Sequence, residues 1–259
     1  MGAVRVTNCI ETKQLSREFD GFWAVDDLDL TIETGMFYGF LGRNGAGKST
    51  TIKMLTGLLA PSKGSIKIFG KDPEQEGLAI KQRIGVVPED LCLFENLTAF
   101  EYLTFIGRMY SMDKKTIAER REELLALFKL DDAEKTLILE FSHGMRKKLS
   151  VAAALIHDPE LLFLDEPFEG MDAIAARTLR TILESFIARD ATVFLTSHIL
   201  EIVEKLCSHV GIIHEGKLVS QSTLKDLTLE GTLENAFIET VGDDNDGTVG
   251  LSWLEKSGP

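Results

Sequence analysis

The stretch "FLGRNGAGKST", residues 40–50, decides how the rest of the chain is interpreted. It fits the P-loop pattern, in which glycines let backbone N–H groups curl around phosphate oxygens without side-chain clashes. Lys48 is expected to reach the β- and γ-phosphates, and the Ser49 hydroxyl is expected to bind Mg²⁺. The expected phosphate-binding residues are Gly42, Arg43, Asn44, Gly45, Ala46, Gly47, Lys48, Ser49 and Thr50. An apolar run before the loop predicts a strand, and "KSTTIKMLTGLL" predicts a helix whose positive N-terminus faces the anion.

A second strand, "LLFLDEP" (residues 161–167), ends in two acids. A buried strand that ends in charge needs a reason, because an unpaired buried carboxylate is costly. Nucleotide-bound Mg²⁺ supplies one: Asp165 would hold the metal through its water shell, and Glu166 would polarise the attacking water. The alternative interpretation is a helix cap or an exposed strand end. Together with the P-loop, the two acids favour the site of a nucleoside triphosphatase.

The run "VFLTSH", residues 193–198, repeats this pattern on another strand. A lone histidine is more often a surface or core residue than a catalytic one. At the tip of a strand beside the acidic one, His198 would contact the γ-phosphate and hold the attacking water. Both interpretations stay open at this point.

The order of apolar patterns along the chain predicts the fold class. Short apolar runs such as "GSIKIFG" predict strands in the first third. Over about 91–157, apolar residues recur at three- and four-residue intervals and predict helices; after them, predicted strands alternate with a helix. We predict an α/β fold: a P-loop core with a parallel sheet, an antiparallel N-terminal β-subdomain and an inserted α-helical subdomain. The predicted domain covers residues 1–227, and 228–259 form a short, partly flexible C-terminal appendage.

The charge balance argues against a nucleic-acid partner. The 259 residues carry 41 acids against 28 bases, a net charge of −13, whereas a phosphate-gripping protein normally has the opposite balance. The basic runs "DKKTIAERR" and "GMRKK" are interpreted as solvated helix faces.

No apolar run is long enough to span a bilayer, and the N-terminus lacks the apolar core of a signal peptide. Three cysteines, Cys9, Cys92 and Cys207, share no metal or redox spacing, which favours free thiols in a reducing cytoplasm.

Taken together, the motifs resemble an ATP-binding cassette (ABC) ATPase, the motor subunit of ABC transporters. The resemblance runs from about Ile10 to Leu227. "GRNGAGKST" is similar to the Walker A loop, "LLFLDE" to Walker B, and "EGMD" to the D-loop with Asp172 in place, while His198 falls at the switch histidine. "SREFDGFWAVDDL" resembles the segment whose aromatic residue stacks on adenine, which implies that role for Phe19. Ordinary core packing is the alternative for Phe19.

Two motifs depart from the family pattern. "FSHGM", residues 141–145, lies where the family has its signature LSGGQ; Ser142 and Gly144 match, and His143 replaces a glycine. The resemblance implies that this motif completes the ATP site of a second subunit. In "IGVVPED", Glu89 stands where the family usually has a glutamine that contacts Mg²⁺ and the attacking water. A carboxylate is a harder, charged metal ligand, so metal binding would survive with altered coupling.

The resemblance implies a function. A subunit of this kind binds ATP and Mg²⁺, dimerises with a second cassette, identical or different, and drives an integral membrane permease on another chain, at the cytoplasmic face of the membrane. "LFENLTAFEYLTFIGRMY" and "GTLENAFIETVG" look like the exporter-type branch. Leu93, Phe94 and Leu97 would line the groove for the permease, or else simply pack the helical lobe.

Two rival functions stay open. One is a soluble cassette ATPase acting on ribosomes or DNA; such proteins usually carry two cassettes or a long coiled-coil insertion, and this chain shows neither. The other is a regulatory nucleotide-binding module that does not turn ATP over. The presence of Lys48, Asp165, Glu166 and His198 argues against that module.

Overall fold

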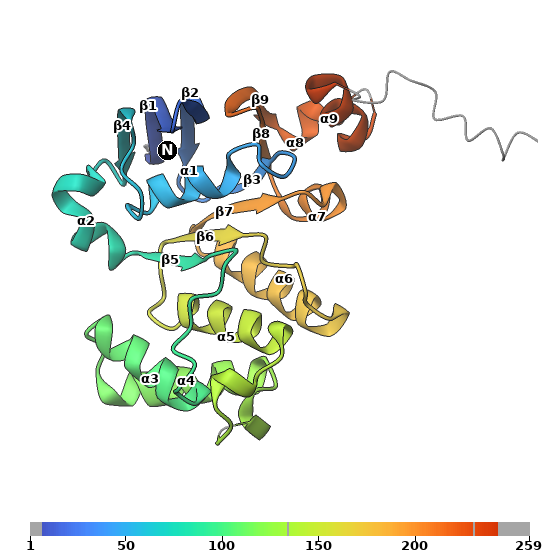
Figure 1. The fold of residues 1–259 in the computed structure, drawn as a ribbon. Coiled ribbons are helices and arrows are strands. Elements are labelled where there is room, and N and C mark those ends of the chain that lie inside the picture. The colour runs from blue at the N-terminus through green and yellow to red at the C-terminus, as the bar shows by residue number, and fades with distance from the viewer. Residues whose placement is uncertain (1–6, 134, 230, 243–259) are drawn as a thin grey trace, which may run out of the picture.

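The computed structural model describes residues 7–133, 135–229 and 231–242. A six-stranded sheet with the order β5-β6-β7-β3-β8-β9 forms the centre of the molecule (Figure 1). Neighbouring strands from β5 to β8 are parallel, and β9 pairs antiparallel with β8. The strands are β3 (Phe37–Leu41), β5 (Ile84–Val87), β6 (Leu161–Asp165), β7 (Thr192–Ser197), β8 (His209–His214) and β9 (Lys217–Thr223). Every residue of β3, β6 and β7 is buried, as expected for strands covered on both faces.

A separate antiparallel sheet lies beside the central one. It has the order β2-β1-β4 and is built from β1 (Asn8–Phe19), β2 (Phe22–Glu33) and β4 (Lys63–Ile68). A tight turn at Asp20 and Gly21, both with positive φ, joins β1 to β2. With the parallel sheet and the helical insertion, this arrangement confirms the predicted fold class.

The helical insertion forms a lobe at the β5 edge of the central sheet (Figure 1). It contains α3 (Ala99–Met109), α4 (Lys114–Leu127) and α5 (His143–Leu155), with 3₁₀ turns at Asp131–Ala133 and Ile138–Glu140. Thr98 and Glu101 form a capping box at the start of α3, and Asp113 caps α4. In the described part of the predicted helical region 91–157, three α-helices are therefore separated by loops and 3₁₀ turns.

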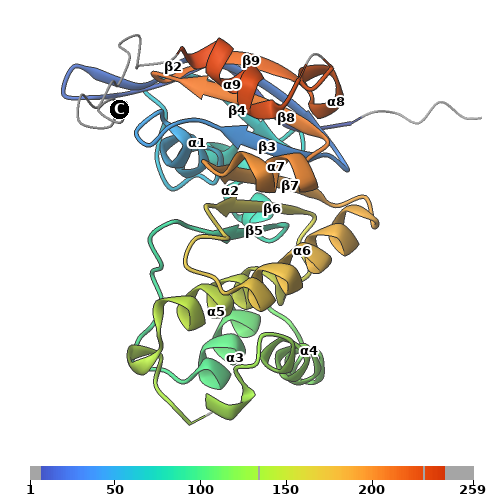
Figure 2. The same ribbon diagram turned by 90° about the vertical axis from the view of Figure 1, so that its right-hand side faces the viewer.

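Helices on both sides of the sheet complete the core (Figure 2). They are α1 (Lys48–Leu55), α2 (Pro73–Lys81), α6 (Ala173–Ile187), α7 (Leu200–Leu206), α8 (Leu224–Leu227) and α9 (Leu233–Val241). Within the segment predicted as an appendage, α9 packs against the body of the chain, and its Leu233 is fully buried. The predicted flexibility of 243–259 concerns positions outside the described residues.

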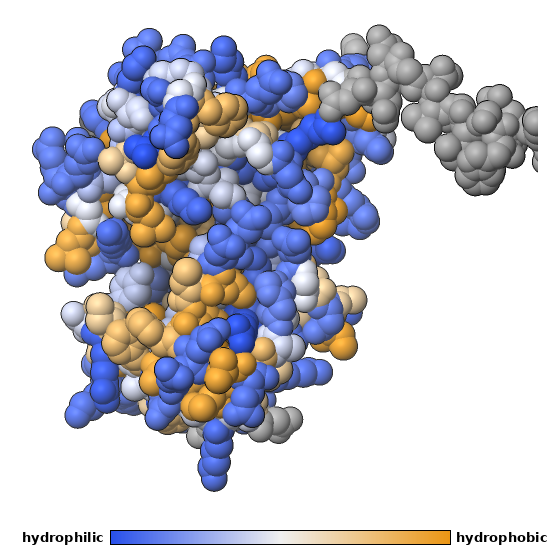
Figure 3. Space-filling model, viewed as in Figure 1, coloured by the Kyte–Doolittle hydropathy of each residue, from blue (hydrophilic) through white to orange (hydrophobic). Residues whose placement is uncertain are grey.

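The surface of the helical lobe is partly apolar. Figure 3 shows hydrophobic side chains gathered over its part of the molecule, and exposed examples are Phe94, Phe105, Met109 and Leu139. Across the described ranges, no helix combines the length and the apolar character needed to cross a bilayer.

Candidate functional site

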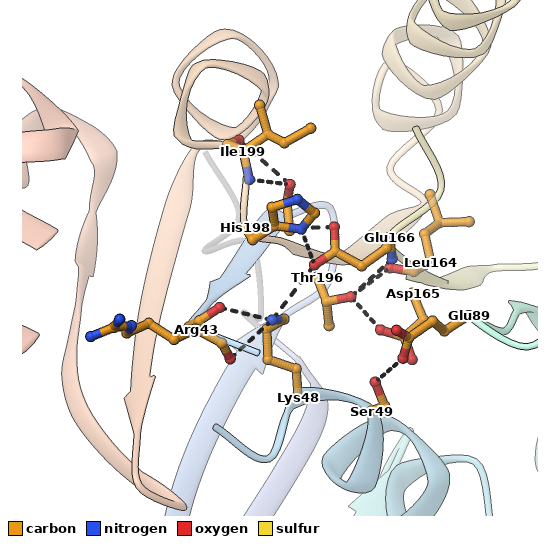
Figure 4. Close-up of polar contacts among 12 residues, drawn as sticks. Arg43, Lys48, Ser49, Glu89, Leu164, Asp165, Glu166, Thr196, His198 and Ile199 are labelled. Atoms are coloured by element: carbon orange, nitrogen blue, oxygen red, sulfur yellow. Dashed lines mark hydrogen bonds and ion pairs between the residues drawn. The ribbon is translucent and has the colours of Figure 1, made fainter. Parts of the chain in front are cut away.

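The predicted site residues meet where parallel strands end. Because β3, β5, β6 and β7 run in the same direction, their carboxyl ends share one edge of the sheet, where α/β proteins bind ligands. The P-loop follows β3, Glu89 follows β5, Glu166 follows β6 and His198 follows β7. Figure 4 shows these side chains converging above the N-terminus of α1.

The P-loop is curled around its own lysine. The Lys48 ammonium donates to the carbonyls of Gly42 (2.7 Å) and Arg43 (3.3 Å), and the side chain is 6% exposed. Gly47 precedes α1 with φ of 107°, and a Cβ there would lie 2.4 Å from the Ala24 carbonyl oxygen, so only glycine fits. Beside the loop is a cavity of about 160 Å³, bounded by the P-loop, Ala24, Glu89 and Glu166.

Glu166 lies between a lysine and a histidine. Its Oε1 is 3.6 Å from Lys48 Nζ and 3.0 Å from His198 Nδ1. The backbone N–H of His198 donates to Oε2 at 3.4 Å. The carboxylate is 6% exposed and borders the P-loop cavity.

Asp165 is buried just before Glu166. The Thr196 hydroxyl donates to its Oδ1 at 2.5 Å and accepts from the Glu166 N–H at 3.1 Å. Burial raises the pKa of Asp165, and hydrogen bonds from Thr196 and Ser49 oppose that rise. The sequence prediction missed Thr196; its signal is a hydroxyl residue two positions before His198, in a strand whose residues are all buried.

The oxygen atoms at this edge fit Mg²⁺. The Ser49 hydroxyl donates to Glu89 Oε2 at 2.8 Å and also reaches Asp165, so one hydroxyl and two carboxylates gather here. No cluster of three or more His, Cys, Asp or Glu that could enclose a metal occurs among the described residues. Mg²⁺ needs none, because it usually keeps several waters and binds one or two carboxylates together with substrate phosphates.

Lys147 corrects one sequence interpretation. The run "GMRKK" was expected to be a solvated helix face, but Lys147 is 1% exposed and donates to the Asp165 carbonyl at 3.3 Å. Burial lowers the pKa of Lys147, and the nearby acids, Asp165 foremost, oppose that change. In the other basic run, Arg121 is also buried. The prediction failed because helix periodicity does not show which charged side chain points at the core.

The signature residues lie apart from the P-loop cavity. Ser142 caps α5 by accepting the Met145 N–H at 3.3 Å, and Gly144 follows within the first turn. The His143 ring lies against Gly170, where an added Cβ would be 2.6 Å from its Cδ2. None of the three lines the cavity.

Asp172 and Phe19 also lie outside this cavity. Asp172 caps α6 by accepting the Ala175 N–H at 2.8 Å, and it pairs with Lys148 at 3.0 Å. Phe19 ends β1 and is 42% exposed, with the Arg17 guanidinium 4.6 Å from its ring centroid. The exposed ring is not a core side chain, which removes the packing alternative.

Comparison with known proteins agrees with the resemblance. The sequence model of the family described as ABC transporter matches residues 25–169. The chain is 42% identical over 217 residues to the bacitracin transport ATP-binding protein BcrA of Bacillus licheniformis, covering 83% of this chain and 70% of that protein. It is 38% identical over 221 residues to the daunorubicin/doxorubicin resistance ATP-binding protein DrrA of Streptomyces peucetius, covering 85% of this chain and 67% of that protein.

A solved ATP-binding subunit of an ABC transporter has the same fold. It superposes with a TM-score of 0.85 at 30% identity, covering 90% of this chain and 99% of that one. A dimeric, post-hydrolysis ATP-binding cassette bound to ADP and phosphate shares the fold with a TM-score of 0.77 at 20% identity. On the family match and these relatives, the chain belongs to the ABC transporter family and is an ABC-type ATPase.

Proposed function

We propose that the chain is the ATP-hydrolysing subunit of an exporter, that it dimerises around two Mg-ATP molecules, and that Glu166 is its general base. One observation supports ATP hydrolysis: Glu166 lies at the edge of the cavity, between Lys48 and His198. The three residues follow three different strands of the central sheet. A binding module without turnover would have no need of a buried carboxylate at this place.

The residues divide the chemistry between them. Lys48 and the P-loop amides bind the phosphates, and Ser49, Asp165 and Glu89 hold Mg²⁺, which neutralises phosphate charge when bound. Glu166 accepts a proton from the attacking water. His198, 3.0 Å from Glu166, orients that carboxylate and contacts the γ-phosphate. Phe19 stacks on the adenine from the exposed end of the β1–β2 hairpin.

The separation of the signature residues supports a dimer. Ser142 and Gly144 present a helix N-terminus, a favourable position for phosphate, yet they do not line this chain's own P-loop cavity. We infer that they and Asp172 contact the nucleotide of a second subunit, placed head to tail. The partner is a second copy or a different cassette.

The apolar surface of the helical lobe supports a permease partner. Phe94 is 56% exposed and packs edge-on to Phe105, with ring centroids 5.3 Å apart, while Leu93 and Leu97 pack beneath on the core. Exposed aromatic groups of this kind mark protein contact sites. The name of a Nod factor export ATP-binding protein, 33% identical over 239 residues, supports export. The names of BcrA and DrrA, a bacitracin transport protein and a drug resistance protein, are compatible with it. The subunit would then lie at the cytoplasmic face of the membrane.

The hydrolytic role is tested by Glu166→Gln, with Glu184→Gln at an exposed position of α6 as the control. We expect Glu166→Gln to lower turnover at least about 100-fold while ATP affinity stays within about threefold, because an amide cannot accept the proton. Glu184→Gln should keep most of the activity. Equal turnover in wild type and Glu166→Gln would rule out Glu166 as the base.

The permease partner is tested with a photocrosslinker at Phe94 in cells, with the same group at Phe22 on the β1–β2 hairpin as control. We expect an adduct with an integral membrane protein from position 94 only. Cosedimentation with ribosomes, and no membrane adduct, would favour the rival function.

A further inference from the structure

The peptide between Asp165 and Glu166 is held from both sides. Its carbonyl accepts from the Lys147 ammonium at 3.3 Å, and its N–H donates to the Thr196 hydroxyl at 3.1 Å. The two holding groups come from different elements, α5 and β7. Together they fix the plane of the peptide that leads into Glu166.

This restraint matters because Glu166 has φ of 46°. Residues other than glycine avoid the left-handed region, at a cost of order 1 kcal/mol or more, and stay there only when their surroundings enforce it. With this backbone conformation the Glu166 carboxylate faces Lys48 and His198. Removing one of the two restraints should let the peptide rotate.

Lys147 is also costly to bury unless it serves a purpose. It is 1% exposed, and an ammonium removed from water loses several kcal/mol of solvation unless acceptors and opposite charges surround it. Four acids act on it, namely Asp165, Glu169, Glu166 and Glu89. Asp165 ends β6, Glu166 and Glu169 follow it, and Glu89 follows the neighbouring strand β5, so the acids that favour the charged lysine belong to the edge of the sheet that carries the candidate site.

We propose that Lys147 is a positioning residue: its ammonium holds the Asp165–Glu166 peptide so that the Glu166 carboxylate faces the attacking water. The proposal rests on the proposed function of Glu166 as base. Lys147 does not line the P-loop cavity, so its effect on the reaction would pass through Glu166. It lies on α5, the helix whose first turn carries Ser142 and Gly144.

A mutant cycle tests this: wild type, Lys147→Met, Glu166→Gln and the double variant, with kcat, KM and ATP affinity measured for each. Methionine matches the length of the lysine stem and removes the charge. We expect Lys147→Met to lower kcat about 10–100-fold, since misplacing a catalytic group by about 1 Å has effects of this size. ATP affinity should stay within about threefold. The double variant should have the residual rate of Glu166→Gln alone, because residues acting as one unit are non-additive.

Lys115→Met, at an exposed position of α4, is the matched control and should behave as wild type. If Lys147→Met does not fold, Lys147→Gln, which retains a donor, takes its place in the cycle with the same non-additive outcome expected. Lys147→Arg should keep more activity than Lys147→Met or Lys147→Gln, because it retains both the charge and a donor.

The outcomes separate the two proposals. Wild-type kcat in the Lys147 variant beside an inactive Glu166→Gln would overturn the positioning role and leave the proposed function intact. Losses that multiply in the double variant would also overturn it, since they mean that Lys147 acts on something other than Glu166. Unchanged turnover in Glu166→Gln would instead reject the proposed function itself.

Discussion

Two neighbouring acids at the end of β6 have different surroundings. Asp165 is capped by the Thr196 hydroxyl, and burial raises its pKa, whereas Glu166 faces Lys48 and His198. The backbone at Glu166 is left-handed, and the two side chains have different neighbours. In the proposed function this difference leaves Asp165 to the metal and Glu166 to the attacking water.

Phe19 provides a test at the same scale. We expect Phe19→Ala to weaken ATP binding about tenfold or more, because stacking of a base on an aromatic ring contributes ~1–3 kcal/mol. Phe22, its register partner across the hairpin and 65% exposed, gives the matched control, Phe22→Ala. Titration with a fluorescent ATP analogue measures both. Equal weakening by the two variants would show that the hairpin, and not the Phe19 ring, contacts the nucleotide.

At the scale of elements, α5 and β5 approach closely at Gly85. A Cβ there would lie 2.3 Å from the Ala154 carbonyl oxygen and 2.7 Å from Leu162 Cδ2. This contact seats the helical lobe, and with it the signature residues, on the sheet.

We predict that Gly85→Ala lowers the free energy of unfolding by about 1–3 kcal/mol, the usual effect of overpacking. Gly77→Ala is the control, because no neighbouring atom lies within 4 Å of the added Cβ and because alanine has a higher helix propensity than glycine at this position in α2. Urea unfolding measures both. If Gly85→Ala were as stable as Gly77→Ala, the helical lobe could move away from the sheet without any loss in the free energy of unfolding, and the prediction would be wrong.

A histidine at the junction of the helical lobe and the sheet should make the stability of the fold depend on pH. His157 stacks on Tyr110 with ring centroids 3.6 Å apart, and its Nε2 donates to the Ile84 carbonyl at 2.9 Å. Burial lowers the pKa of His157, so below the ordinary value of about 6.5 the unfolded chain binds a proton that the folded chain does not. Stability therefore falls as the pH drops from about 6.5 toward the folded-state pKa, and this contribution is constant above that window.

His157→Gln should flatten the pH dependence. Its amide can donate to the same carbonyl but does not titrate. Urea unfolding at pH 7.5 and 5.5 should show a larger loss of stability in wild type than in the variant. Equal losses would contradict the assignment of this dependence to His157.

Across the whole molecule, the elements that depend on residues close together in the sequence could be predicted from it. The central strands are continuous apolar runs because both faces are covered, and the P-loop glycines are required by local backbone geometry. Parallel strands then bring Glu166 and His198 together, although 32 positions separate them in the chain.

What escaped prediction depends on tertiary contacts. Lys147 resembles its less buried neighbours Arg146 and Lys148 in sequence, and only the packing of α5 on the sheet buries it. The helix α2 has a polar sequence with one buried residue, Ile80, so its periodicity is weak. The helix α9 packs on the body through Leu233, Phe237 and Val241, and a helix of nine residues gives too short a pattern to show in the sequence which partner it packs on.

The central claim is that two chains complete each other's ATP sites, and ATP-dependent dimerisation of Glu166→Gln tests it most directly. Mass measurement by light scattering during gel filtration should give a monomer without nucleotide and a dimer with ATP and Mg²⁺, because the trapped nucleotide is not consumed. Adding Ser142→Ala, which removes the hydroxyl proposed to contact the partner's phosphate, should shift the protein back toward monomer. If the Ser142→Ala double variant dimerises with ATP as well as Glu166→Gln does, the account is contradicted. A Glu166→Gln protein that binds ATP and stays monomeric would exclude a second copy of the chain as the partner and leave a different cassette.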